Sequence, residues 1–159
     1  MGDRTWIRIT VRREDEDKVE RELQWGGPNG EALDSSPVVV FSSDEVNYGG
    51  SDETDRLAAA GIPYWVEHGQ GGGYQSGEGV CDGEIGLFVS TVQDRYFVET
   101  DAEGHIDSVS HKRLLEFLQL KRRTMALLGL RGPVEQLAAA VEMATLYGVS
   151  DVLKGENNE

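Results

Sequence analysis

The sequence predicts an α+β fold: a mostly antiparallel sheet with a β-meander, helices on one side of it, and a C-terminal helical hairpin. Three observations favour this class. Strand and helix patterns alternate in the first part of the chain, short strands separated by turns follow in the middle, and two helical patterns end it. A doubly wound α/β fold is the alternative, but the middle of the chain provides hairpins where that fold needs crossover helices.

The first part of the chain reads as strand, helix, strand. Residues 5–12 alternate between apolar and polar side chains, which is typical of a half-buried strand. Residues 14–24 begin with acids and carry Val19 and Leu23 four apart, which predicts an amphipathic helix. Residues 38–41 are continuously apolar, so a central strand covered on both faces is expected there.

The middle of the chain predicts the meander. A short helix over residues 51–61 leads into an alternating strand over residues 62–67. Asp82-Gly83 is the strongest hairpin turn signal, because this pair favours the positive φ angles that tight turns need. Strands over residues 85–89 and 96–98 are expected to follow it.

The last part of the chain predicts the helical hairpin. A long helix over residues 111–128, capped by Ser110, carries a broad apolar stripe, and a second helix spans residues 132–147. A homodimer through these two helices is one expectation, because both stripes could face a second copy. Residues 1–154 are expected to form a single domain, with a disordered tail at residues 155–159.

The formal net charge of the chain is −14, and the excess of acids lies in its middle. Residues 31–107 hold sixteen Asp or Glu against only Arg56 and Arg95, which gives −14 for that segment alone. Such a surface would repel phosphates, so direct nucleic-acid binding is disfavoured. Two interpretations remain open: a solvated face that maintains solubility, or a surface that attracts a basic partner.

The cysteine and histidine content argues against several classes of protein. A single cysteine, Cys81, cannot form an internal disulfide, and the N-terminus lacks the apolar run of a signal peptide, so a cytoplasmic protein is expected. No apolar stretch is long enough to cross a bilayer. One Cys and three scattered His lack zinc-ligand spacing, and residues 101–104 read as a plain turn, so neither a metal nor a cofactor is expected.

The candidate site lies within residues 44–83, where acids, glycines and aromatic residues are concentrated. Loops of this composition often shape binding sites, and Tyr is a residue type enriched in interface hot spots. The candidate partner-binding residues are Asp44, Glu45, Tyr48, Asp52, Glu53, Asp55, Tyr64, Glu67, His68, Gln70, Tyr74 and Gln75.

The glycine-rich segment 69–77 admits more than one interpretation. It differs from phosphate-binding loops, because it runs from strand to strand and no Lys follows it. A flexible hairpin loop is one interpretation, and a shaped loop that offers Tyr74 and Gln75 to a partner is another. A small enzyme with a pocket at this loop, using Glu67 or His68 as general base, is the alternative function.

The stretch EVNYGG, followed by DETDRLAAAGIPY and HGQGGGYQSG, resembles small uncharacterised acidic proteins of bacterial phages and mobile elements. The resemblance covers about a third of the chain, and its motif carries no chemistry. It implies an anti-defence setting that includes anti-CRISPR proteins, which often occupy nucleic-acid-binding surfaces of host complexes. It implies no catalytic residue.

The leading hypothesis is therefore a non-catalytic acidic binding protein. Its expected partner is a basic protein or complex, such as a host defence nuclease, whose nucleic-acid-binding surface it would occupy. Neither direct nucleic acid nor a membrane is expected as a partner.

Overall fold

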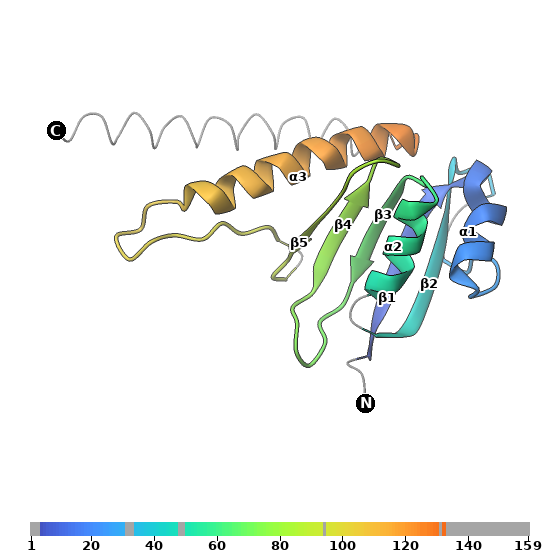
Figure 1. Ribbon diagram of the computed structural model, residues 1–159, viewed down its shortest axis with the longest axis horizontal. Coiled ribbons are helices and arrows are strands. Elements are labelled where there is room, and N and C mark those ends of the chain that lie inside the picture. Colours follow the sequence, from blue (N-terminus) through green and yellow to red (C-terminus); the bar gives the residue numbers. More distant parts are fainter. Residues whose placement is uncertain (1–3, 31–33, 48–49, 94, 131, 133–159) are drawn as a thin grey trace.

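The computed structural model describes residues 4–30, 34–47, 50–93, 95–130 and 132, and these form an α+β fold (Figure 1). The elements follow one another as β1 (Arg4–Arg12), the 3-10 turn η1 (Arg13–Asp15), α1 (Glu16–Leu23), β2 (Val38–Asn47), α2 (Ser51–Ala59), β3 (Tyr64–His68), β4 (Gly77–Cys81), β5 (Gly86–Ser90) and α3 (Ser108–Leu127). The predicted order of strands and helices up to β3 is thus confirmed.

All five strands pair antiparallel in the order β2-β1-β3-β4-β5. Because β3, β4 and β5 are consecutive in the chain and adjacent in the sheet, the predicted meander is confirmed. The prediction that residues 38–41 form a central strand is wrong, since β2 lies at an edge. Its apolar run is covered on both faces nonetheless: Val38 packs in one hydrophobic cluster and Val39 in the other.

Helices α1 and α2 cover one face of the sheet. Side chains at alternate positions of β1, β2 and β3 form a hydrophobic core with them, and the buried hydroxyl of Thr54 in α2 donates to backbone carbonyls of its own helix start. From the helices, Val19, Leu23 and Leu57 enter this core, and each is 2% exposed or less. Gly61, with φ +68°, ends the α2 region in the left-handed conformation that favours glycine.

Helix α3 packs on the opposite face, so the prediction that the helices share one side of the sheet is wrong. Trp65 of β3 and Val80 of β4 belong to the α3 cluster, whereas Tyr64 and Val66 belong to the cluster under α1 and α2. Successive residues of a strand point to opposite faces. Both faces of β3 carry large side chains, and each face therefore needs a helical cover.

The chain between β5 and α3 departs from the predicted strand at residues 96–98. Within the described residues it holds only two isolated bridges, Val92 with Arg95 and Thr100 with Ile106. The side chain of Tyr96 instead turns into the sheet and packs edge-on against Phe117, with ring centroids 5.8 Å apart. Exposure still alternates from Arg95 to Glu99, so residues 96–98 differ from the predicted strand in having no ladder partner among the described residues.

Helix α3 starts earlier than predicted. Asp107, and not Ser110, is its N-cap, and the Asp107 carboxylate accepts a hydrogen bond from the Ser110 backbone N–H at 2.7 Å. The predicted second helix and the tail at residues 155–159 lie outside the described residues except for Gly132. Among the helices described, none is long and apolar enough to cross a membrane.

Candidate functional site

Two of the predicted acids, Asp44 and Glu45, lie at an irregularity in β2. The register between β1 and β2 shifts between Thr5 and Ile7, so Asp44 and Glu45 together stand opposite the single residue Trp6. This is a β-bulge, which twists a strand and redirects its side chains. Both Asp44 and Glu45 are exposed there.

Helix α2 brings further acids to the same end of the sheet. β2 ends where α2 begins, as Figure 1 shows, and Asp52 and Asp55 are exposed on the helix. Asp52 also lies in the first turn, where the helix dipole stabilises negative charge. We call the four exposed residues Asp44, Glu45, Asp52 and Asp55 the acidic edge. Glu53 is separate from it, because its half-buried carboxylate lies 3.8 Å from the Arg56 guanidinium.

The acidic edge is sparsely neutralised. Glu45 pairs with Arg4, whose guanidinium lies 2.8 Å from the carboxylate, and both side chains are largely exposed. Within the part of the chain that the structure describes, the other three carboxylates have no ion-pair partner. Exposed carboxylates of this kind remain available to a cationic partner.

The predicted contacts Tyr64 and Tyr48 are not part of the acidic edge. Tyr64 is 2% exposed and packs in the core under α1 and α2, so its prediction as a partner contact is wrong. Burial raises the pKa of its hydroxyl. Tyr48 lies outside the described residues. Burial of Tyr64 follows from its position in the chain, because Ile62 just before β3 and Val66 within it pack in the same cluster.

The glycines of residues 69–77 make room for aromatic rings. A Cβ atom on Gly69 would lie 2.4 Å from the Trp6 indole nitrogen, and one on Gly71 would lie 2.5 Å from the Tyr74 ring. The Gly69 N–H donates to the Trp6 carbonyl at 3.1 Å. The loop is therefore packed on rings, which favours the shaped loop over the flexible one; Gln70 and Gln75 are exposed on it.

Glu67 and His68 line only a small cavity. They line a cavity of about 60 Å³ together with Trp6, Ser76, Gly77, Glu78 and Thr91. A water molecule occupies about 30 Å³ in the liquid, so this volume suits a few waters at most. The His68 ring packs edge-on against Tyr74 at 5.7 Å, and Tyr74 does not line the cavity. The alternative of a small enzyme at this loop gains no support from this geometry.

Cys81 and the turn at residues 101–104 were considered from the sequence as a nucleophile and as a metal site. Cys81 is buried in the core under α1 and α2, and burial raises the pKa of its thiol, so it is a poor nucleophile. Asp101, Glu103 and His105 are exposed and their ligand atoms lie within 4.8 Å of one another. Asp101 accepts hydrogen bonds from the backbone N–H groups of Glu103 and His105, which fits the predicted plain turn.

A buried polar cluster under α3 was not anticipated from the sequence. Glu78 is 7% exposed, and its carboxylate accepts hydrogen bonds from the Trp65 indole at 2.7 Å and from the Tyr96 hydroxyl at 2.5 Å. Lys121 of α3 forms an ion pair with it and also donates to the Tyr96 oxygen at 2.8 Å. We call Glu78, Trp65, Tyr96 and Lys121 the Glu78 cluster.

The Glu78 cluster connects α3 to the sheet through hydrogen bonds and an ion pair. Burial, followed by the charge of Glu78, raises the pKa of the Tyr96 hydroxyl, which therefore stays protonated and donates. The Lys121 ammonium also lies 5.1 Å from the centre of the Trp65 ring. A sequence signal for this cluster does exist: Lys121 falls seven residues after Leu114 and four after Phe117, within the apolar stripe of the helix.

Comparison with protein-family models, with curated protein sequences and with solved structures finds no match to this chain.

Proposed function

We propose that this chain is a non-catalytic binding protein whose acidic edge contacts a basic surface of another protein. The observation that carries the proposal is the bulge in β2, at which Asp44 and Glu45 are both exposed, near the end of the sheet where α2 begins with the exposed Asp52 and Asp55 (Figure 1). Four exposed carboxylates with one arginine partner among the described residues form a surface of negative charge. Such a surface attracts cations and steers association.

The class of partner follows from the charge. Surfaces that bind nucleic acid present Lys and Arg side chains to phosphates, and carboxylates can take the place of those phosphates. A protein of a phage or mobile element that occupies such a surface on a host defence nuclease or CRISPR complex is the setting we propose. The protein would then act without touching nucleic acid itself.

The proposed homodimer loses part of its basis. The stripe of α3 is buried against the sheet through Phe117, Leu118 and Leu120, and is not available to a second copy. The remaining residues proposed for that contact lie in the second helical pattern, outside the described residues. A dimer through that pattern alone can be tested by light scattering of the full chain.

The experiment compares two variants with equal changes of charge. In the first, Asp44, Asp52 and Asp55 are all replaced by Lys; in the control, the exposed acids Glu84, Glu99 and Glu103 are replaced by Lys. Each is used as bait in a bacterial lysate at low and at high salt. We expect wild type and control to retain a basic partner at low salt, and the acidic-edge variant to lose it.

A second measurement tests the mechanism. The captured partner is assayed for nucleic-acid binding with and without added wild-type protein, and we expect competition that weakens as salt screens the charges. Equal retention of the partner by both variants would contradict the proposal, provided that circular dichroism shows both to be folded. Loss in both variants would point to net charge and away from the acidic edge.

A further inference from the structure

The two edges of the sheet are protected differently. At the β2 edge, the backbone N–H groups of Asn29 and Gly30 donate to the Val40 carbonyl at 3.1 and 2.9 Å. The Asn29 side chain adds a hydrogen bond to the Ser42 carbonyl at 2.9 Å and accepts one from the Ser42 N–H at 2.7 Å. The loop thus forms hydrogen bonds with the outward backbone groups of β2, as a further strand would. Such covering is a common protection against unwanted strand pairing.

The β5 edge has no such cover among the described residues. The hydrogen bonds from Asp82 N–H to Ile85 O and from Thr91 N–H to Ser76 O fix the alternation of the β4–β5 ladder. In an antiparallel pair every second residue bonds to the neighbouring strand. Leu87 and Val89 therefore bond to β4, and the N–H and C=O groups of Gly86, Phe88 and Ser90 point outward from the sheet.

The composition of β5 leaves this edge accessible. Edge strands are usually guarded by charged side chains or proline, and β5, with the sequence GLFVS, has neither. Phe88 remains 45% exposed on the face away from α3, where its ring lies over Gly79. A Cβ atom on Gly79 would come within 2.5 Å of that ring. The edge thus combines backbone groups that have no partner among the described residues with an exposed aromatic side chain.

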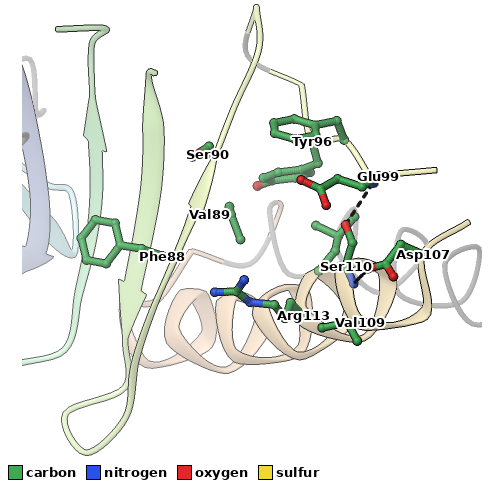
Figure 2. Close-up of a pocket in the computed structure, with 11 residues that line it drawn as sticks. Phe88, Val89, Ser90, Tyr96, Glu99, Asp107, Val109, Ser110 and Arg113 are labelled. Atoms are coloured by element: carbon green, nitrogen blue, oxygen red, sulfur yellow. Dashed lines mark hydrogen bonds between the residues drawn. The ribbon is translucent and has the colours of Figure 1, made fainter. Parts of the chain in front are cut away.

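A hollow of about 290 Å³ adjoins this edge on the α3 side (Figure 2). Its apolar wall includes Val89, Phe97, Val109 and Leu114, of which Phe97 is 45% and Val109 64% exposed. Figure 2 shows Arg113 extending from α3 toward β5. The carboxylates of Glu99 and Asp107 also line the hollow, and Asp107 is engaged as the N-cap of α3. No ion pair joins Arg113 to either acid or to another described residue, so the guanidinium on the β5 side can accept a carboxylate of a partner (Figure 2).

We infer that β5 is a docking edge for an extended peptide segment of another protein, which adds to the sheet as a sixth strand. The outward backbone groups of Gly86, Phe88 and Ser90 would bond to the peptide backbone, which accounts for affinity without sequence selectivity. Alternate side chains of the peptide would enter the hollow. Its walls select an apolar residue and, toward Arg113, an Asp or Glu.

The hollow favours a peptide over a second copy of this chain. If two β5 strands paired about a two-fold axis, the side chains on the α3 face would be Leu87 and Val89 of each copy. Those side chains are already packed under α3 of their own chain, so they could not fill the hollow. A free segment brings side chains that can, and the volume suits one or two of them. This edge is also distinct from the acidic edge, so the inference does not depend on the proposed function.

The first test uses the unmodified full chain. Random peptides displayed on phage are selected against it, and the most enriched peptide is synthesised. We expect alternating apolar residues and an acidic residue in the enriched set. Amide hydrogen exchange is then followed with and without the peptide. Leu87 and Val89 should be protected in both states, while Gly86, Phe88 and Ser90 should become protected only with peptide bound.

Two pairs of variants complete the test. Ser90→Pro removes one outward N–H and should weaken the peptide at least about tenfold, whereas Ser90→Ala retains that N–H and should bind as wild type. Arg113→Glu should weaken the acidic peptide by a similar factor, whereas Arg122→Glu, an exposed change on the same helix, should not. The exchange experiment stands by itself if the proline variant does not fold.

Three results would overturn the inference. They are the absence of any enriched peptide, protection of Phe88 and Ser90 already in the free protein, and equal binding by Arg113→Glu and Arg122→Glu. Protection in the free protein would mean that this chain itself, or a second copy, occupies the edge. Light scattering across the concentrations used would distinguish those two occupants.

Discussion

The two faces of the sheet are stabilised in different ways. Under α1 and α2 the buried side chains are almost entirely apolar, so burial of hydrophobic area accounts for their association. Under α3 the apolar contacts surround a buried ion pair, Glu78 with Lys121, whose attraction must offset the loss of hydration of both charges. The face under α1 and α2 should therefore be sensitive to changes in side-chain size, and the face under α3 also to changes in charge.

The largest expected effect is on the α3 face. Lys121→Met removes one partner and leaves the Glu78 carboxylate buried without its cation, so we expect a loss of about 3–5 kcal/mol in the free energy of unfolding. Urea denaturation at neutral pH measures it. The matched control is the double variant Glu78→Leu with Lys121→Met, which removes both charges and should recover most of the loss. A double variant as unstable as the single one would show that the ion pair itself stabilises α3.

On the other face, Leu57→Ala tests hydrophobic burial. Leu57 is fully buried between α2 and the sheet, and its truncation should cost about 2–5 kcal/mol through lost burial and a residual cavity. This loss should be the same at low and at high salt, because no charge is involved. Denaturation at two salt concentrations checks it, with Ala59→Ser on the exposed side of α2 as control. A strong salt dependence would contradict the assignment of this face as apolar.

A smaller, pH-dependent effect is expected at the β4–β5 turn. Burial of Asp82 disfavours its charge, but the Ile85 and Glu84 N–H groups and Arg123 outweigh it, so its pKa is lowered. A lowered pKa in the folded state contributes stability above the unfolded value of 3.8, which is lost as pH falls through the folded pKa. Asp82→Asn should therefore be less stable than wild type at neutral pH and converge with it in acid. Thermal melts from pH 7 downward measure this, and a constant difference would contradict it.

The smallest effect is expected at an ion pair that, unlike Glu78 with Lys121, is exposed to solvent. Arg4 and Glu45 lie 2.8 Å apart, yet their side chains are 63% and 73% exposed, so solvent screens them. Arg4→Ala should change the free energy of unfolding by less than about 1 kcal/mol. The same variant should strengthen salt-sensitive binding of a basic partner, because it frees one carboxylate of the acidic edge. Denaturation and affinity measured together separate these two effects.

Local elements and the class of fold could be predicted from the amino-acid sequence. The alternation in residues 5–12, the stop at Gly61 and the Asp82-Gly83 turn depend on neighbours close in the chain, and all three agree with the structure. Charge and exposure of Asp44, Asp52 and Asp55 were equally accessible, since isolated carboxylates rarely become buried.

Only the tertiary structure decided which face each element covers and which polar groups are buried. Tyr64 and Trp65 are adjacent aromatic residues, yet strand pairing sends one to each face, and both find a helix there. From the sequence, Glu78 would be predicted as a surface acid. It is buried because β4 lies between β3 and β5 in the sheet and because α3 places Lys121 against it. The open β5 edge was equally hidden, because strand order depends on contacts between residues distant in sequence, and local periodicity carries no information about them.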